Sequence, residues 1–244
     1  MSHSRFCSAC LAVLLSLLVA TGPSRAVDDP PDVEINPLNG LIEVTDAFLD
    51  GGDYEIRHVV KPSSGPALEE VVLTDDAAGD LGSRIDIKPN GETWVVWWRD
   101  SAVDEVLYRV RDFQTGAWTA EARISSQGVG SRHPEIVHDG ATTWVAFETD
   151  HVAGTALAVS ATNDSPEPFP TATIVAATDF TGNPDVLIES TLGHVWITWV
   201  DSADKVGWSE YDHGTGLWSE PQLEPYGEKV EDAREAIRTT VLGP

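Results

Sequence analysis

The chain has 244 residues, with 40 Asp and Glu against 15 Lys and Arg and a formal net charge of −25. This charge excludes nucleic-acid binding, which needs a basic surface, and it disfavours an anionic membrane for the same reason. Divalent cations, basic partners and neutral glycans remain compatible with it, although acidity also serves simply to keep an exported protein soluble.

The first 26 residues have the layout of a secretory signal peptide. Arg5 precedes an apolar stretch at 11–20, and Ser24 and Ala26 fit the small-residue positions of a cleavage site. The apolar stretch is too short to span a membrane, and no later segment approaches that length. Both cysteines lie within these residues, so the exported chain would have no thiol chemistry. We expect a secreted or periplasmic protein, with a short linker at 27–30 before the fold.

Beyond the linker the sequence repeats about every 50 residues, a period typical of solenoids, propellers and arrays. Four units are expected, at 31–76, 82–126, 130–176 and 182–224. The first unit is the most diverged, and its expected strands are 33–35, 41–48, 54–60 and 68–73. Since one such unit cannot bury its apolar faces alone, neighbouring units must pack together.

The second unit shows the strand pattern of one repeat. Its expected strands contain Ile85 and Ile87, Trp94–Trp98, Val106–Val110 and Thr119–Ile124. Alternation and β-branched or aromatic side chains favour strands, and Asn90-Gly91 is typical of a hairpin turn between the first two.

The second strand of each unit is apolar on both faces. In the second unit, Trp94 and Val96 lie on one face, and Val95 and Trp97 lie on the other. Such a strand must be covered on both faces, as happens between the blades of a propeller. We therefore predict an all-β protein, a β-propeller of about four four-stranded blades. Three large side chains are expected at equal depth in its core, namely Trp97, Phe147 and Trp199.

A turn between the third and fourth strands also repeats. Asp112, Thr115-Gly116 and Trp118 return at identical spacing as Asp212, Thr215-Gly216 and Trp218. We expect the Asp to accept backbone N–H bonds, the Gly to adopt a positive φ and the Trp to pack against the next unit. This turn resembles the Asp-box, the bacterial neuraminidase repeat, of sialidase-like β-propeller proteins. The resemblance implies that these turn residues are structural and that ligands bind at the opposite end of the blades.

Acidic residues begin the loops at that opposite end. Asp50, Asp100, Asp150 and Asp201 follow the second strands at nearly even spacing, and Asp75, Asp76 and Asp80 join them from a loop between units. They could form a ring that binds a cation or sugar hydroxyls, or they could simply be turn formers. The spacing of a helix–loop–helix calcium site is absent, so we predict no metal and no cofactor.

Two arginines start the first strands. Gly82-Ser83-Arg84 returns as Gly130-Ser131-Arg132, so Arg84 and Arg132 are expected at equivalent places in the channel, with Arg234 as a potential third. Sialidases hold a carboxylate with an arginine triad, and guanidinium–carboxylate pairing is strong and bidentate. Alternatively, each Arg pairs with a neighbouring Asp. Trp98 would add a stacking platform beside them.

No catalytic residue stands out. A sialidase needs a Tyr nucleophile with a Glu partner, and known sialidases have six blades. The tyrosines mostly fall in expected strands of the repeat, namely Tyr54, Tyr108, Tyr211 and Tyr226. We therefore predict non-catalytic recognition of a glycan or a protein, without turnover of glycosides. A sialidase-like or other glycoside hydrolase and a structural interaction scaffold are the alternatives. Residues 227–244 form either a helix or a further strand.

Overall fold

The computed structural model describes residues 30–140, 142–152, 154–163, 169–178, 187–191, 194–200 and 205–225. The expected signal peptide, Asp201, Tyr226 and the tail at 227–244 with Arg234 lie outside the described residues. Where the chain is described, it forms strands and no helix, so no helix there could cross a membrane.

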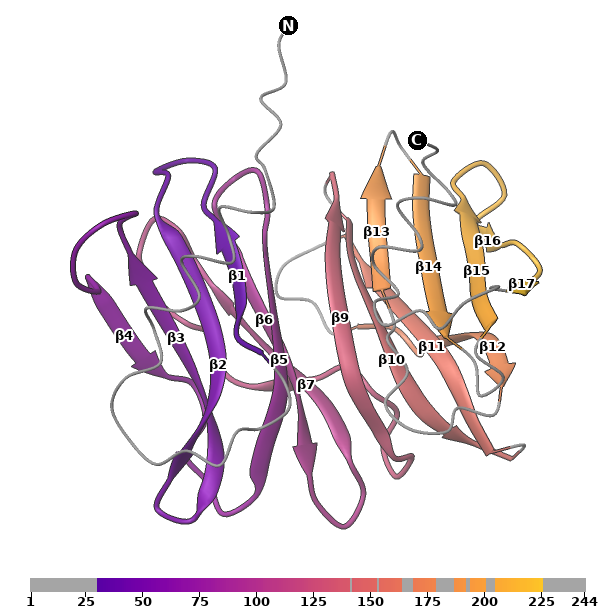
Figure 1. Cartoon of the computed structure of the whole chain (residues 1–244), viewed down its shortest axis with the longest axis horizontal. Helices are drawn as coiled ribbons and strands as arrows, with labels where there is room; N and C mark the ends of the chain where they lie inside the picture. Colours follow the sequence, from indigo (N-terminus) through magenta and orange to yellow (C-terminus); the bar gives the residue numbers. More distant parts are fainter. Residues whose placement is uncertain are drawn as a thin grey trace, which may run out of the picture.

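The strands form four antiparallel sheets, which we call blades I to IV (Figure 1). Blade I contains β1 (Asp32–Ile35), β2 (Ile42–Asp50), β3 (Asp53–Lys61) and β4 (Glu69–Val72). Blade II contains β5 (Gly79–Ile87), β6 (Thr93–Asp100), β7 (Glu105–Arg111) and β8 (Ala122–Arg123). Blade III contains β9 (Ser131–Asp139), β10 (Thr142–His151), β11 (Gly154–Thr162) and β12 (Thr173–Thr178). Blade IV contains β13 (Leu187–Thr191), β14 (His194–Val200), β15 (Lys205–Asp212), β16 (Leu217–Trp218) and β17 (Gln222–Pro225).

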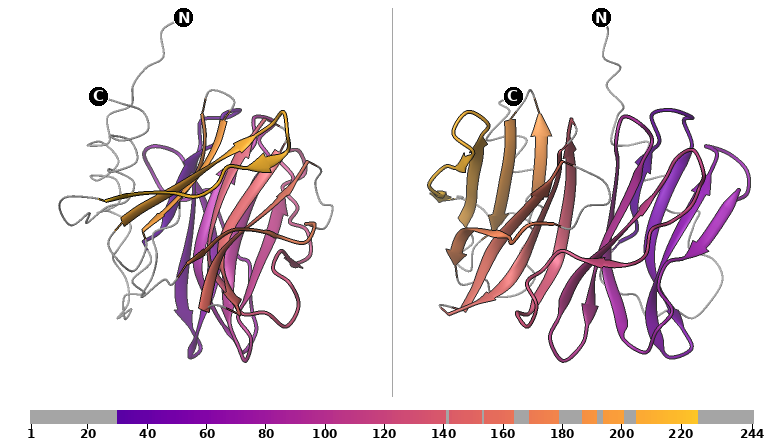
Figure 2. Two further views of the ribbon diagram at one scale, coloured as in Figure 1. Left: turned by 90° about the vertical axis from the view of Figure 1, so that its right-hand side faces the viewer. Right: turned by 180° about the vertical axis from the view of Figure 1, so that it is seen from behind.

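The blades follow one another along the chain and pack through their first strands. Strand β5 lies against β1 and β9, and β9 lies against β13. Figures 1 and 2 show blades I and IV at the two ends of this row. The loops β2–β3, β6–β7 and β10–β11 lie at the bottom of Figure 1, which we call the loop end, and the other end is the turn end. The predicted all-β fold of four blades, each with four strands side by side, is confirmed. In blade IV, the short strands β16 and β17 both pair with β15 and share the outer place.

The hydrophobic core consists of clusters between neighbouring blades. Trp94 and Val96 of β6 belong to a cluster shared with blade III, whereas Val95 and Trp97 belong to one shared with blade I. A third cluster joins blades III and IV. The prediction that the second strand is covered on both faces is therefore confirmed. The three side chains expected in the core are all buried, since Trp97, Phe147 and Trp199 are at most 1% exposed.

The aromatic residue after each outer turn packs on the preceding blade. Trp118 of blade II lies edge-on to His58 of blade I, with ring centroids 5.0 Å apart. Phe169 and Trp218 pack in the same way on the buried tryptophans of blades II and III. Our expectation that the ring packs against the next unit was wrong. Sheet twist carries the outer strand of a blade over the face of the blade before it.

The acidic turn residues behave as expected. The carboxylate of Asp112 accepts bonds from the N–H and the hydroxyl of Thr115, and Asp212 accepts from the N–H groups of Gly214 and Thr215. These bonds hold the pKa of both carboxyl groups below the usual value. The glycine that follows, at 116 or 216, has a φ of 69° or 71°, as the turn requires.

The first strands of blades II and III each contain a β-bulge. The register shift lies between Leu81 and Arg84 in β5, and between Arg132 and Glu135 in β9. The register makes Glu135 the counterpart of Arg84 and Leu81 the counterpart of Arg132. Our prediction that the two arginines are equivalent was therefore wrong. Aligning the two Gly-Ser-Arg motifs places the strands three residues away from the alignment that the structure gives. Cross-strand pairing, and not the local motif, sets the register of a strand.

Candidate functional site

Three of the predicted aspartates lie at the loop end. Asp50, Asp100 and Asp150 are exposed at the ends of β2, β6 and β10. Of these, Asp150 contacts another predicted site residue, because one of its oxygens lies 3.6 Å from the Arg132 guanidinium. Three of the predicted aspartates are therefore exposed at the loop end, and one of them contacts Arg132.

Arg132 is the centre of that cluster. Its guanidinium lies 3.3 Å from a carboxylate oxygen of Asp104, in the β6–β7 loop, and 3.3 Å from Glu148 on β10. The side chain of Glu148 is only 4% exposed, so its charge needs partners inside the protein. Arg132 therefore connects a loop of blade II to a buried carboxylate of blade III.

His133 occupies the bulge of β9 in an unusual backbone conformation. Its φ is 50°, and it is the one residue other than glycine with a positive φ in the described part of the chain. The same bulge position in blade II holds Gly82, with a φ of 59°. Glycine adopts this conformation freely, whereas a side chain there costs on the order of 1–2 kcal/mol. Blade III therefore carries backbone strain that places an imidazole at the loop end, and such strain concentrates at functional sites.

The imidazole of His133 contacts both an aromatic ring and an acid. Its Nδ1 lies 3.1 Å from Glu148 Oε1, and its ring lies edge-on to Trp98, with centroids 5.5 Å apart. The indole N–H of Trp98 is buried and has no hydrogen-bond partner among the described residues. These contacts bring together an indole ring, a guanidinium, an imidazole and a buried carboxylate. The loop-end site consists of Trp98, Asp104, Arg132, His133, Glu148 and Asp150.

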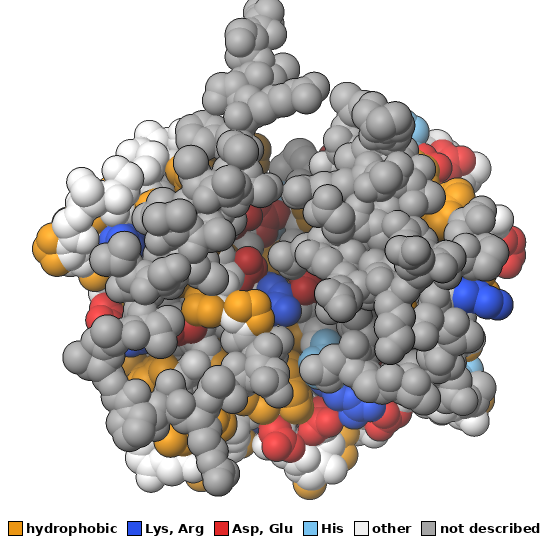
Figure 3. Space-filling model, viewed as in Figure 1, with side chains coloured by type: hydrophobic (Ala, Val, Ile, Leu, Met, Phe, Trp, Pro, Cys, Tyr) orange, Lys and Arg blue, Asp and Glu red, His pale blue; other side chains and the backbone are white. Residues whose placement is uncertain are grey.

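Arg84 does not join the loop-end site. Its Nε donates to Glu135 at 2.8 Å, and its Nη1 donates to the backbone oxygen of Ser83. Arg84 pairs with Glu135, whereas Arg132 pairs with Asp104 and Glu148, so each guanidinium contacts different carboxylates. On the face of the molecule that Figures 1 and 3 show, basic and acidic side chains lie close together near the middle.

Carboxylates also join the first strands of successive blades. Asp32 of β1 accepts from the backbone N–H of Ile85 at 2.9 Å, and Asp86 of β5 accepts from that of His138 at 2.6 Å. Burial raises the pKa of Asp86 to about 6. Both aspartates therefore hold the inner strands together through backbone groups that would otherwise lack partners.

Glu34 lies near these two aspartates and differs from them. Its side chain keeps an exposed surface, yet burial by the surrounding protein raises its pKa to about 7, and the charges of Asp86 and Asp32 add to the shift. A carboxyl group with this pKa is half protonated near neutral pH. That is the property a general acid needs.

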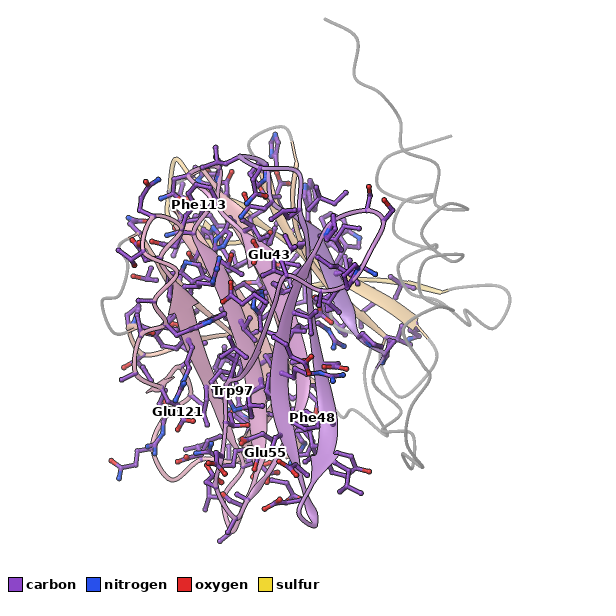
Figure 4. The ribbon with its side chains drawn as sticks, turned by 90° about the vertical axis from the view of Figure 1, so that its left-hand side faces the viewer. Glu43, Phe48, Glu55, Trp97, Phe113 and Glu121 are labelled. Carbon is purple, nitrogen blue, oxygen red and sulfur yellow. The ribbon has the colours of Figure 1, made fainter. Side chains whose placement is uncertain are left out.

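The acids of the loop between blades I and II have structural partners. Asp80 is fully buried and accepts from the Trp97 indole at 2.9 Å and from Arg99 at 3.0 Å, and burial raises its pKa to about 6. Asp76 also pairs with Arg99, at 2.7 Å, while Asp75 is exposed. Figure 4 shows Trp97 and Glu121, another partner of Arg99, toward the loop end. Asp76 and Asp80 thus both form ion pairs with Arg99 of blade II.

The described residues contain no group of three or more His, Asp or Glu side chains arranged to hold a metal ion.

The sequence reasoning missed His133, Glu148 and Asp104. Two features could have pointed to the first two. Proline follows His133, and a proline in a first strand is typical of a bulge or an edge. Glu148 directly follows the apolar run that ends at Phe147, and a charge that continues such a strand needs a partner.

No family model matches the chain, and no curated protein matches it in sequence. Solved structures match it in fold. A thermostable family-43 glycoside hydrolase has a TM-score of 0.55 at 11% identity, over 83% of this chain and 78% of the hydrolase. An α-L-arabinanase from Penicillium chrysogenum, complexed with arabinobiose, has a TM-score of 0.55 at 11% identity, over 82% and 67% of the two chains. A Hadza microbial sialidase has a TM-score of 0.57 at 12% identity, over 78% of this chain but 45% of the sialidase.

At such low identity these matches show the fold alone. The chain has a sialidase-like propeller fold that glycoside hydrolases also have. The resemblance stated from the sequence is thus supported at the level of the fold.

Proposed function

We propose that the chain recognises a neutral glycan at the loop-end site between blades II and III. The observation that carries the proposal is His133, which adopts a φ of 50° where blade II has a glycine. Glycine would fit the bulge without strain, so the fold does not require the histidine there. A strained side chain beside a half-buried tryptophan is better explained by a ligand.

The residue types at this site suit a saccharide. A sugar ring offers C–H groups to an aromatic face and hydroxyl groups to polar side chains, and Trp98 provides the first kind of partner. His133, Arg132 and Asp150 provide donors and an acceptor at the rim. The strongly negative chain disfavours acidic sugars, because they would be repelled on approach. That the fold is shared with glycan-acting enzymes supports the same class of ligand.

Two substitutions test the site by isothermal titration with neutral oligosaccharides, including arabinobiose and cellotriose. We expect H133G and W98A each to weaken binding at least about tenfold, the equivalent of about 1.4 kcal/mol. H133G should remain folded and lose less than about 1 kcal/mol of stability, because relief of strain offsets the lost bond to Glu148.

Val103→Ala is the matched control, since Val103 is an exposed residue of the same loop that carries Asp104. It should leave the affinity unchanged. Equal affinity in the parent, H133G and W98A would reject the loop-end site as the place of recognition.

Glycoside hydrolysis is the second candidate function, favoured by the raised pKa of Glu34 beside Asp32 and Asp86. In this reading Glu34 donates a proton to the leaving oxygen and a neighbouring carboxylate acts as its partner. The enzymes with this fold support the reading as well.

If the purified chain hydrolyses arabinosides or xylosides, its rate should fall as pH rises through about 7, because Glu34 then loses its proton. Glu34→Gln should abolish that rate, whereas Glu70→Gln, an exposed acid of blade I paired with Arg57, should not change it. A rate that survives in Glu34→Gln would exclude this role, and no hydrolysis across a glycoside panel would leave recognition as the function.

A further inference from the structure

A cavity of about 550 Å³ lies between blades III and IV, away from the loop-end site. One wall is formed by Pro170, Thr171 and residues 173–175, at and before β12, and the other by Tyr211 and residues 216–221, from the end of the β15–β16 turn onward. Trp144, at the start of β10, lines it between these walls and is 5% exposed. The residues of the β15–β16 turn place the cavity at the turn end of the blades.

The corresponding place between blades II and III is filled. There Trp94 stacks on Tyr108, with ring centroids 5.4 Å apart and an interplanar angle of 9°, and Phe169 lies edge-on to it. The indole N–H of Trp94 donates to Glu92 at 2.7 Å. Every side of this tryptophan therefore has a partner from the protein, and Trp94 is 0% exposed.

Strand register identifies the change that opens the cavity. Tyr108 lies opposite the residue two places after Trp94, and Val159 lies opposite the residue two places after Trp144. Val159 is thus the counterpart of Tyr108, and it lacks the aromatic ring that covers the tryptophan in blade II. The loss of a ring from a packed interface leaves a void that the neighbouring side chains do not fill.

The tryptophan in the cavity also lacks a polar partner. The indole N–H of Trp144 is buried without a hydrogen-bond partner among the described residues, whereas that of Trp94 is satisfied. Tyr211 and Trp218 lie edge-on to Trp144, with centroids 4.5 and 5.8 Å away. The buried indole N–H groups of Trp98, Trp118 and Trp199 also lack a partner among the described residues, but of these tryptophans it is Trp144 that lines the cavity. Its N–H is therefore the donor next to this space.

We propose that this cavity is a second saccharide-binding site that takes one or two neutral sugar units. Its volume falls within the range of small-molecule sites, and its lining of three aromatic rings suits the apolar face of a sugar. A hydroxyl of the sugar accepts the N–H of Trp144, and Ser219 and Glu220 at the rim accept from other hydroxyls. The site is independent of His133 and needs no catalysis.

The test uses Val159→Tyr, which restores the ring that blade II has, with arabinobiose and cellotriose as probes. In the full chain with H133G, which removes the loop-end site, we expect each probe to bind with a Kd in the micromolar-to-millimolar range. Tryptophan fluorescence measures this Kd. Adding Val159→Tyr should weaken the binding at least about tenfold. Trp144→Phe, which removes the N–H and keeps an aromatic ring, should weaken it about threefold or more, and it serves if the tyrosine variant fails to fold.

The control is Val110→Ala, a core change opposite Trp94 at the filled interface, which should leave the affinity unchanged. Binding that is unaltered by both Val159→Tyr and Trp144→Phe would overturn the proposal, as would no binding of either probe to the H133G chain. Binding of a proline-rich peptide and not of sugars at this place would also overturn it, because aromatic grooves accept such peptides too. Weaker binding in the H133G chain than in the parent bears on the loop-end site, whereas the cavity is tested by the further effect of Val159→Tyr in the H133G chain, so the two proposals fail separately.

Discussion

Replacing Trp199 with alanine is expected to lower the free energy of unfolding by roughly 3–5 kcal/mol. Trp199 is 1% exposed and belongs to the cluster that joins blades III and IV. Gly207 on the neighbouring strand leaves room for the indole, because an added Cβ there would overlap with it. The indole therefore fills its space closely, and the surroundings can relax only partly into the cavity that its removal would create. Urea titration of the parent and the variant measures the difference.

Trp196→Ala provides the matched control, because Trp196 lies on the other face of the same strand and is only partly buried. Trp196→Ala should lower the free energy of unfolding by less than half as much as Trp199→Ala does. Equal losses for the two variants would show that the core between blades III and IV is not where the register places it.

Replacing Glu43 with alanine is expected to cost a similar amount, roughly 3–5 kcal/mol. Glu43 is fully buried at the interface of blades I and II (Figure 4). Its carboxylate accepts bonds from Asn36 at 2.8 Å, His58 at 2.9 Å and Thr93 at 2.8 Å. All three partners are 0% exposed, so removal of the acid leaves three buried polar groups without their partner.

The loss of stability caused by Glu43→Ala should depend on pH. Burial alone would raise the pKa of Glu43, but the bonds from His58, Asn36 and Thr93 hold it below its usual value. A carboxyl group whose pKa is lower in the folded protein stabilises the fold at pH values above its unfolded pKa of 4.5. That contribution is lost as the pH falls through the pKa of the folded state. The difference in the free energy of unfolding between parent and variant should therefore be largest near neutral pH and should narrow as the pH falls below 4.5. Glu70→Ala, an exposed acid of blade I, should cost less than about 1 kcal/mol. A pH-independent difference would show that the Glu43 carboxylate is not the stabilising group.

The candidate site was only partly predictable. Trp98, Arg132 and Asp150 come together at the loop end, but Arg84 pairs with Glu135 elsewhere on the inner strands. The bulge of β9 explains much of the difference. One extra residue in a strand changes which side chains share a face. The proline after His133 is compatible with either a bulge or an edge strand, so it does not fix the register.

The sequence by itself determined the features that arise within a single unit. The alternation of Trp94 and Val96 with Val95 and Trp97 specified strands covered on both faces, and Asp112 with Gly116 specified the outer turn. Hairpins and turns depend on residues only a few positions apart, so their chemistry can be read locally.

Only the tertiary structure decided what depends on two blades at once. It set the blade on which Trp118 packs, the partners of Arg132, and the cavity beside Trp144. Each of these depends on the volume and charge of side chains from two blades, which meet only when sheet twist and strand register bring the blades together.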